Sequence, residues 1–482
     1  MKRPNILLII LDAVRAKNLS IYGYEKNTTP NLKKLLPNCV LYRNAISSSY
    51  WTMPSIASLF TGTYPSTHYL IHDGDVLRPN FITLPEFLKE NGYLTIGLSP
   101  NPYVSRYSGL HRGFDIFDDF FSKSRGARAL DWINEESLRK YFKKFLETTK
   151  NTELYKKMFW YFTGFSDKYA MNTNQKIFSL IQNIRSCNKP FFIYVHYNEA
   201  HTPYLLPRLY REHFLKLNLN KEPWKINQND AKYYSNEIKM NNDDFQILKD
   251  IYDGAIKYLD QIVYDIFIYL KNNDLFENTL IIVTSDHGDQ LGEHDLFLHH
   301  FSLYDELIKI PLIIKYPKNV QINRVETKIV QNVDIFPTIL DLLQVDNKFL
   351  FKQFQGNSII SSSINNRNQT YGISELLKPF GPSMMKYKHI LKKYDRKLIS
   401  IRTMNHKYIY STNGKHEYYD LKNDPNEINN IINMHSNIKS ELKNNLNPWI
   451  KKFSSEIFYK EQRDKLKIAI NKVRKKKTRT KN

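Results

Sequence analysis

Four side chains in this chain have types and positions suited to binding a metal ion and activating a nucleophile. They are the carboxylates of Asp12 and Asp286, the imidazole of His287 and the hydroxyl group of Thr52. Carboxylate oxygens and an imidazole nitrogen suit Mn²⁺ or Zn²⁺. A divalent ion among them would lower the pKa of the Thr52 hydroxyl and make it a usable nucleophile. These residues therefore predict metal-dependent nucleophilic chemistry.

The local sequence around each of these residues predicts where it lies in the fold. Asp12 closes the apolar run 5–11 and Asp286 closes the run 279–285, so both carboxylates are expected where buried parallel strands end. That edge of an open α/β sheet is where ligands bind. Thr52, with Pro54 and an apolar run after it, predicts a helix whose N-cap is Thr52.

Strand-like and helical segments alternate along most of the chain, which predicts an α/β fold with a doubly wound, largely parallel sheet between helices. The clearest expected strands are 6–11, 94–98, 191–195, 280–283 and 310–314, with helices at 29–36, 84–91, 243–272 and 333–343. Later short strands at 397–402, 408–411 and 417–421 and a helix near 427–453 predict a small antiparallel C-terminal α+β subdomain.

At 482 residues the chain can hold a large domain and a smaller one. We expect a catalytic domain at 1–345, the antiparallel subdomain at 346–455 and a basic helical or disordered tail at 456–482. A mostly helical insertion at about 120–185 and a variable polar segment at about 205–240 are expected to shape the substrate pocket.

The formal charge of +22 includes ten Lys or Arg residues between positions 461 and 482. This tail is either a solvated segment or a contact for an anionic surface. No aromatic residues alternate with the basic ones, so nucleic acid is not an expected partner. No stretch approaches the roughly 18 apolar residues of a membrane span, and Asp12 interrupts the only run that resembles a signal peptide. We expect a cytoplasmic protein, peripheral at a membrane surface if the tail binds one.

Several motifs occur in an order that resembles the sulfatase-like branch of the alkaline phosphatase superfamily. They are Ile10–Arg15, Trp51–Ser55 with Phe60–Pro65, His196–Tyr204, Thr284–Gly288, Leu303–Glu306, Val333–Thr338 and Tyr419–Pro425. The resemblance spans nearly the whole chain. It implies the alkaline-phosphatase-like fold and an ester hydrolase or phosphotransferase.

The chain departs from sulfatases at the residues that define their chemistry. Sulfatases convert the Cys or Ser of a Cys/Ser-x-Pro-x-Arg motif to formylglycine, whereas this chain has Thr52 and Ile56. Threonine cannot give that aldehyde, so no formylglycine is expected. Ala13 replaces a family carboxylate and His287 replaces an Asn, which favours Mn²⁺ or Zn²⁺ over Ca²⁺.

The set Asp12, Thr52, Asp286 and His287 is similar to that of phosphoethanolamine transferases and lipoteichoic acid synthases, in which a Thr attacks phosphorus. The resemblance implies that these four residues bind the metal and that Thr52 attacks a phosphoester, most simply a phosphodiester. The second metal of related phosphodiesterases needs an Asp-x-x-x-His motif. The comparable residues here are Asp260 and Tyr264, so one ion is expected.

The resemblance also implies roles for residues near this set. His201 and His300 are candidates to protonate the leaving alcohol, while His299, Asn198 and Arg15 are candidates to bind substrate. Asn198 and Arg15 could instead tie loops together, and which of His299 and His300 faces the site is open. His196 is expected behind the metal ligands.

Three functions remain open. The chain is expected to hydrolyse or transfer a phosphate ester, whose other part could be a glycan or a lipid. One alternative is a sulfate ester cleaved without formylglycine. The other is a non-catalytic anion-binding protein that uses the basic tail.

Overall fold

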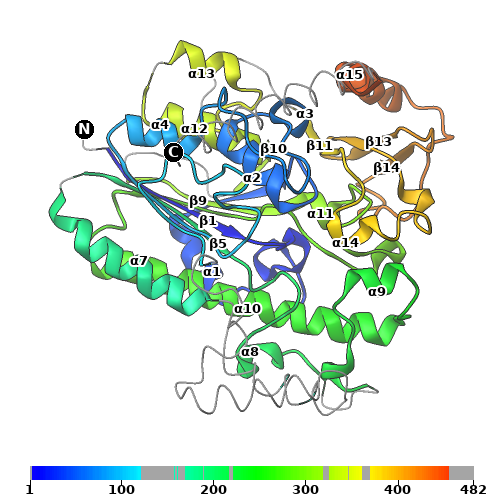
Figure 1. The fold of residues 1–482 in the computed structure, drawn as a ribbon, viewed down its shortest axis with the longest axis horizontal. Helices are drawn as coiled ribbons and strands as arrows, with labels where there is room; N and C mark the ends of the chain where they lie inside the picture. Colours follow the sequence, from blue (N-terminus) through cyan, green and yellow to red (C-terminus); the bar gives the residue numbers. More distant parts are fainter. Residues whose placement is uncertain are drawn as a thin grey trace, which may run out of the picture.

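The structure is a computed structural model that describes residues 3–120, 157, 160, 169–187, 189–216, 221–318, 325–345, 347–360 and 370–454. Within these residues a large sheet has the strand order β10-β2-β9-β6-β1-β5-β3-β4, and a smaller one has the order β11-β12-β13-β14. The large sheet lies between helices, and the small one lies beside it (Figure 1). The strands of the large sheet are β1 (Asn5–Leu11), β2 (Val40–Ile46), β3 (Leu94–Leu98), β4 (Ile116–Asp118), β5 (Phe191–Tyr197), β6 (Thr279–Thr284), β9 (Lys309–Lys315) and β10 (Val325–Gln331).

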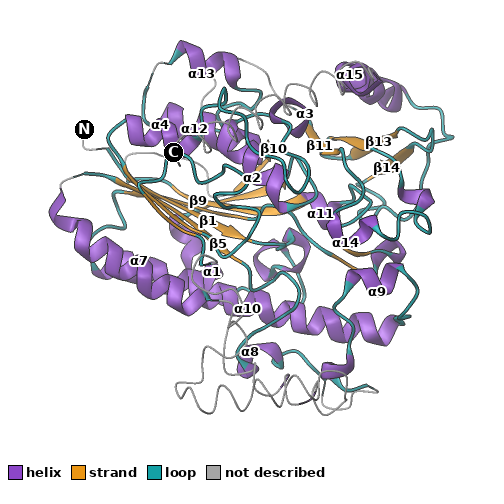
Figure 2. Ribbon diagram, in the orientation of Figure 1, coloured by secondary structure: helices purple, strands orange, loops and turns teal. Residues whose placement is uncertain are grey.

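Alternation along β1 explains why helices cover both faces of the sheet (Figure 2). Ile6, Leu8 and Ile10 join one buried apolar cluster, which includes residues of α2 (Thr52–Thr61), α4 (Leu84–Glu90) and α12 (Ile335–Leu342). Leu7 and Ile9 join the cluster on the other face, with α1 (Pro30–Leu35), α7 (Ala170–Ile184) and α10 (Asn242–Asn272). A strand buried on both faces is typical of parallel sheets covered by helices.

The pairing of the strands confirms the expected doubly wound and largely parallel sheet. β1 pairs in parallel with β5 on one side and with β6 on the other, with Leu11 opposite Tyr197 and Ile10 opposite Thr284. β9, expected among the strands of the parallel sheet, runs antiparallel to both β2 and β6. Only the short α11 (Asp305–Ile308) directly precedes β9, so no helical crossover returns the chain to the parallel direction.

The C-terminal sheet is antiparallel, as expected, and contains β11 (Gly372–Leu376), β12 (Leu398–Arg402), β13 (His406–Ser411) and β14 (Glu417–Asp420). The helix that follows is α15 (Asn437–Ser454), which starts ten residues later than the predicted position 427. Asp424 accounts for part of the difference, because its carboxylate accepts the Ile428 and Asn429 amides in a turn. The small sheet contacts the segment that follows β2, where Glu375 N donates to Ser48 O at 2.9 Å.

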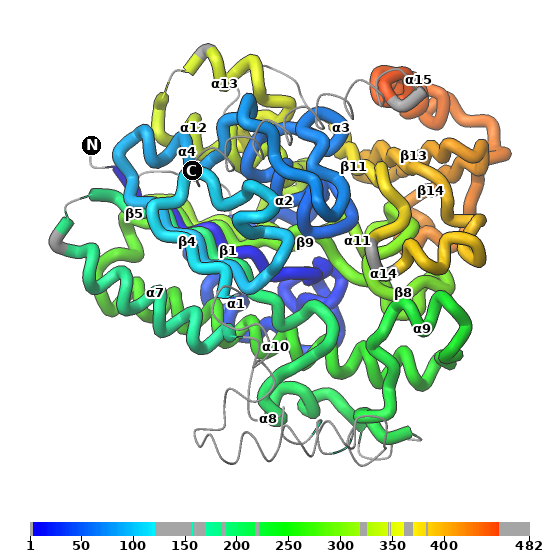
Figure 3. Tube along the Cα trace, viewed as in Figure 1, coloured from blue at the N-terminus to red at the C-terminus, as the bar shows by residue number. Residues whose placement is uncertain are grey.

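Of the expected insertion at 120–185, the structure describes α7, while most of the remainder and the tail at 456–482 lie outside the described residues. The polar segment at 205–240 contains α8 (Arg208–Arg211) and α9 (Asp230–Tyr234). Figure 3 shows α9 beside β8 (Phe297–Leu298), and Tyr234 OH donates to Phe297 O at 3.0 Å. No helix in the described part of the chain has the length and apolar character that a bilayer crossing requires.

Candidate active site

Thr52 lies at the start of α2, but it is the first helical residue and not the N-cap residue that the sequence predicts. Trp51 has the extended backbone of an N-cap, and Thr52 is the first helical residue. Its hydroxyl does not cap the helix. Oγ1 lies 3.3 Å from the Nε2 atom of His287, in a position where the side chain is 3% exposed. The helix start therefore directs a buried hydroxyl group toward the strand ends.

Asp12 follows β1 and is fully buried. Its Oδ2 atom accepts hydrogen bonds from His196 Nε2 at 2.9 Å and from Asn101 Nδ2 at 2.7 Å. Its Oδ1 atom has no hydrogen-bond partner among the described residues and lies 3.7 Å from His287 Nε2. His196 thus supports the carboxylate from behind, as expected, and one carboxylate oxygen is directed into the site.

Asp286 and His287 follow β6 and are arranged in the same way. Asp286 Oδ1 accepts the backbone amides of His287 at 2.9 Å and Ala13 at 3.2 Å, whereas Oδ2 has no partner in the described structure. His287 Nδ1 donates to the Gly288 carbonyl at 2.8 Å. This bond places the ring proton on Nδ1 and turns the Nε2 lone pair toward Asp286 Oδ2, 3.6 Å away.

These atoms fit a single divalent cation. One ligand atom each from Asp12, Asp286 and His287 lies within 4.8 Å of the others, and all three residues are buried. Two buried carboxylate oxygens without donors are costly unless a cation faces them. The donor set of two carboxylates, an imidazole and the Thr52 hydroxyl suits Mn²⁺ or Zn²⁺.

The electrostatics of the two carboxylates differ. Burial alone would raise the pKa of Asp12, but the nearby imidazoles of His201 and His196 lower it below its ordinary value. Burial and the negative charge of Asp12 raise the pKa of Asp286. The two acids repel each other, which a bound cation would relieve.

Hydrogen bonds and close packing hold the turn that contains Asp286. The hydroxyls of Ser47 and Ser55 donate to the Asp286 carbonyl at 2.6 and 2.7 Å, so α2 positions both Thr52 and the strand end. A Cβ atom on Gly288 would lie only 2.1 Å from the Glu306 carbonyl oxygen. Glycine is therefore required where the turn passes α11.

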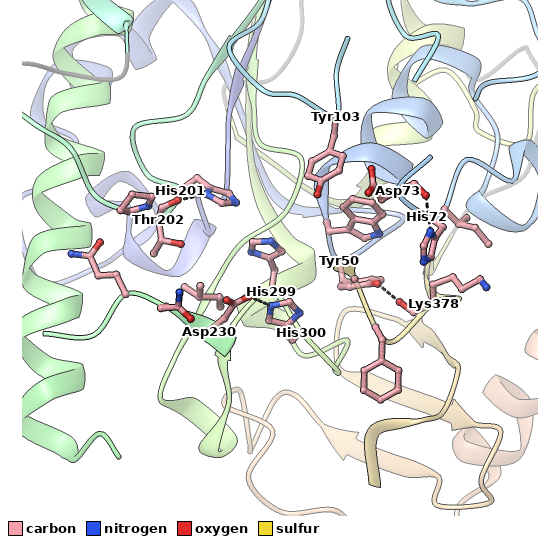
Figure 4. Close-up of a pocket in the computed structure, with 18 residues that line it drawn as sticks. Tyr50, His72, Asp73, Tyr103, His201, Thr202, Asp230, His299, His300 and Lys378 are labelled. Carbon is pink, nitrogen blue, oxygen red and sulfur yellow. Dashed lines mark hydrogen bonds and ion pairs between the residues drawn. The ribbon is translucent and has the colours of Figure 1, made fainter. Parts of the chain in front are cut away.

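The predicted histidines His201, His299 and His300 line one pocket (Figure 4). The His299 ring lies 4.6 Å from the His287 ring and 5.1 Å from the His201 ring, between centroids. His300 is bonded instead to Asp230, with 2.8 Å between Nε2 and Oδ2. His299 is therefore the member of the adjacent pair that faces the metal ligands.

These histidines form one wall of a pocket of about 290 Å³. Tyr50, His72, Asp73 and Lys378 lie on the opposite side of the pocket (Figure 4), and Trp51 and Tyr103 also line it. Gln228, Asn229 and Asp230 from the segment at 205–240 contribute as well. The pocket lies directly beside the Thr52 helix start, because Trp51 precedes the nucleophile candidate.

Arg15 and Asn198 do not line the described part of this pocket. The Arg15 guanidinium is buried, donates to the Asp289 carbonyl at 3.0 Å and lies 3.2 Å from Glu293 Oε1. The Asn198 carbonyl accepts the His201 amide at 3.1 Å. Both residues thus take part in loop contacts, which corresponds to the alternative left open by the sequence.

Sequence reasoning missed Asn101 and Asp289. Asn101 follows β3 and reaches Asp12, and its Nδ2 lies 3.5 Å from Thr52 Oγ1. Its position after a strand end was the available signal. Asp289 is fully buried and its Oδ1 lies 2.7 Å from His299 Nδ1; burial raises its pKa to about 7. Asp260, considered for a second metal, instead accepts the backbone amides of Asn31 and Leu32 at the start of α1.

Comparison with known proteins identifies the family of the chain. The profile of the Sulfatase family matches residues 4–345. The chain belongs to the sulfatase family. A second profile, the C-terminal region of N-sulphoglucosamine sulphohydrolase, matches residues 292–452. The protein is therefore a sulfatase-family ester hydrolase of the alkaline phosphatase superfamily.

Relatives in this sulfatase family are distant but extend over most of the chain. The multifunctional alkaline phosphatase superfamily protein PehA of Trinickia caryophylli is 25% identical and covers 89% of this chain and 91% of its own. Choline-sulfatase of Rhizobium meliloti is 24% identical and covers 89% of this chain and 82% of its own.

Solved structures show the same fold. A protein bound to its substrate D-glucosamine-2-N,6-O-disulfate aligns with a TM-score of 0.69 at 19% identity, over 94% of this chain and 99% of its own. Phosphonate monoester hydrolase of Agrobacterium radiobacter aligns with a TM-score of 0.67 at 19% identity, over 94% and 96%. The fold thus occurs with both sulfur and phosphorus esters.

Proposed function

We propose that this sulfatase-family protein cleaves or transfers a phosphate ester, most simply a phosphodiester, with Thr52 as nucleophile. The observation that carries the proposal is the buried Thr52 hydroxyl, 3.3 Å from His287 Nε2 and beside two carboxylate oxygens that lack donors. Asp12, Asp286, His287 and Thr52 would hold one Mn²⁺ or Zn²⁺ ion. When bound, that ion would acidify the hydroxyl and stabilise developing negative charge.

The chain's own residues supply the remaining steps. Thr52 Oγ1 attacks phosphorus and the bond to the leaving alcohol breaks, which leaves a phosphothreonine. His201 and His300 line the pocket and are the proposed proton donors to that alcohol. Water or an acceptor alcohol then attacks phosphorus, and the bond to Oγ1 breaks. Hydrolysis and transfer are thus two outcomes of one scheme.

The charges around the pocket favour an ester with one negative charge. Among the described residues that line it, Lys378 is the only Lys or Arg, and it lies on the wall opposite His299. The Arg15 guanidinium is occupied by the Asp289 carbonyl and Glu293. A dianionic monoester would meet fewer permanent cations than it needs, whereas a diester has one charge for the metal and histidines to balance.

A sulfate ester is the second candidate, because it also has one charge and several relatives are named as sulfatases. The solved relative with a bound disulfated glucosamine makes a sugar ester a reasonable form of this substrate. Thr52 at the position of the formylglycine precursor counts against the usual sulfatase reaction. An assay must determine whether phosphorus or sulfur is attacked.

The experiment compares the native protein with Thr52→Ala and Thr52→Ser on a bis-aryl phosphate and on an aryl sulfate, with Mn²⁺ or Zn²⁺ present. We expect diesterase activity that Ala abolishes and Ser partly retains. Acid quenching followed by peptide mass spectrometry should find a phosphoryl group on Thr52.

Undiminished activity of the Ala variant would refute the nucleophile. A strong preference for the aryl sulfate would favour the second candidate. Metal-loaded protein without activity on either ester, but with anion binding, would instead support a non-catalytic role. Assays with lipid- or glycan-linked phosphodiesters, with and without an acceptor alcohol, would separate hydrolysis from transfer.

A further inference from the structure

We propose that Asp289 is a positioning residue that fixes the ring orientation and the tautomer of His299 beside the reacting ester. The inference rests on the proposed function only in taking an anionic ester as the ligand of His299. Asp289 Oδ1 lies 2.7 Å from His299 Nδ1, and the Asp289 side chain is completely buried. When Asp289 is ionised its carboxylate can only accept, so the bond then requires the proton on Nδ1 of the neutral ring.

His299 depends on a side-chain contact because its backbone is irregular. It follows the two-residue strand β8, and the nearby residues Leu298 and Phe301 have φ values of 57° and 62°. Such a loop gives little control over the direction of a side chain. A short bond to a buried acid supplies that control, and it leaves Nε2 for the ester.

Asp289 is itself held rigidly. Arg15 Nη1 donates to its carbonyl at 3.0 Å, and the neighbouring Gly288 amide donates to Leu307 O at 2.8 Å. This explains why Arg15, although absent from the described pocket lining, lies so close to the site. It fixes the peptide that carries the acid, and the acid in turn fixes His299.

A second metal ion is the competing interpretation, because ligand atoms of His287, Asp289 and His299 also lie within 4.8 Å of one another. That arrangement would require His287. However, His287 Nε2 already faces Asp12 and Asp286, and its Nδ1 donates to Gly288 O. The shared imidazole therefore favours one ion and an Asp-His pair over two ions.

The adjacent residue supplies a matched control. His300 is bonded to Asp230 with the same chemistry at 2.8 Å, but through Nε2 and to an acid whose side chain is 22% exposed. Asp289→Asn and Asp230→Asn therefore each remove one carboxylate from one of two neighbouring histidines. Only the first substitution should change His299.

The test measures histidine tautomers by ¹⁵N NMR of the metal-loaded protein with labelled histidine, assigned with His299→Gln and His300→Gln. We expect His299 to be protonated on Nδ1 in the native protein and in Asp230→Asn. In Asp289→Asn we expect that tautomer to be lost. An unchanged His299 signal in Asp289→Asn, or two bound metal ions that fall to one in that variant, would overturn the proposal.

Kinetics give an independent measurement. Asp289→Asn should lower kcat about 10- to 100-fold, by analogy with the loss of a hydrogen-bonding partner from a metal-binding imidazole. The double variant of Asp289→Asn and His299→Ala should have a kcat less than threefold below that of His299→Ala alone. Fully additive losses of kcat would contradict the proposal.

Asp289→Glu tests the same carboxylate in case Asn perturbs folding, and it should retain the Nδ1 tautomer. Because the NMR measurement needs no turnover, it stands even if the protein cleaves neither ester.

Discussion

The Oγ1 atom of Thr52 and the Nε2 atom of His287 lie 3.3 Å apart, although 235 residues separate them in the chain. One atom belongs to the first turn of α2 and the other to the residue pair that follows β6. A common cation could contact both. The relationship therefore brings the proposed nucleophile and a proposed metal ligand together in one buried site.

Metal removal should abolish activity reversibly. Because Asp12 Oδ1 and Asp286 Oδ2 face the site without donors, chelation by EDTA should eliminate ester cleavage. Mn²⁺ or Zn²⁺ should restore activity better than Ca²⁺, because the site contains an imidazole and Ala13 replaces one carboxylate of the family. Activity and bound metal are measured on the same dialysed sample. Best recovery with Ca²⁺ would contradict the proposed ligand set.

Asn101→Ala should weaken the metal site without removing a ligand. Its amide donates to Asp12 Oδ2 at 2.7 Å, and loss of such an orienting group costs about 10- to 100-fold in metal affinity or activity. Metal titration followed by activity measures the effect. Asn91→Ala is a suitable control, because Asn91 is the C-cap residue of α4 and its amide bonds to Phe87 O. Equal effects of both variants would exclude a specific role for Asn101.

Asp260→Ala should reduce stability but not metal content. The carboxylate accepts the amides of Asn31 at 2.9 Å and Leu32 at 2.7 Å, which otherwise have no partner within α1. Loss of a helix cap costs about 1 kcal/mol of unfolding free energy. Urea denaturation measures that loss, and elemental analysis measures the metal. A fall in bound metal would return Asp260 to the list of candidate ligands.

Glu375→Gln should make the free energy of unfolding less dependent on pH between acid and neutral conditions. Burial raises the pKa of Glu375 from 4.5 to about 7, despite hydrogen bonds from Ser66. The folded protein therefore holds this proton more tightly than the unfolded chain does. The resulting stability is complete below about pH 4.5 and disappears as pH rises through about 7.

A pKa shift of this size corresponds to about 3 kcal/mol. Urea denaturation at pH 5 and pH 8 should show a smaller difference for Glu375→Gln than for the native protein. Parallel pH dependence in the two proteins would show that Glu375 ionises normally.

The sequence predicted the largely parallel sheet, and it placed Asp12, Asp286 and His287 at one sheet edge, because both depend on strong local patterns. Apolar runs such as 279–285 form strands buried on both faces, and the polar residue that ends each one must reach the same sheet edge. The strand β10 was missed, since four of its seven residues are not buried and its register shifts between Glu326 and Ile329. A mixed pattern of this kind carries little period-2 signal.

Other parts of the site depend on tertiary contacts that no local pattern reveals. The orientation of His299 and His300 could not follow from strand alternation, because Leu298 and Phe301 both have positive φ. Asn101 lies in a loop whose composition resembles an ordinary turn. Arg15 reaches Asp289 and Glu293, which follow more than 270 positions later in the chain.

The two oxygens of Asp12 have different partners, which limits how this carboxylate could bind a cation. His196 and Asn101 both donate to Oδ2, whereas Oδ1 accepts no hydrogen bond from the described residues. Rotation of the carboxylate would break both bonds to Oδ2. Asp12 would therefore offer the proposed cation one oxygen and keep the other for its neighbours.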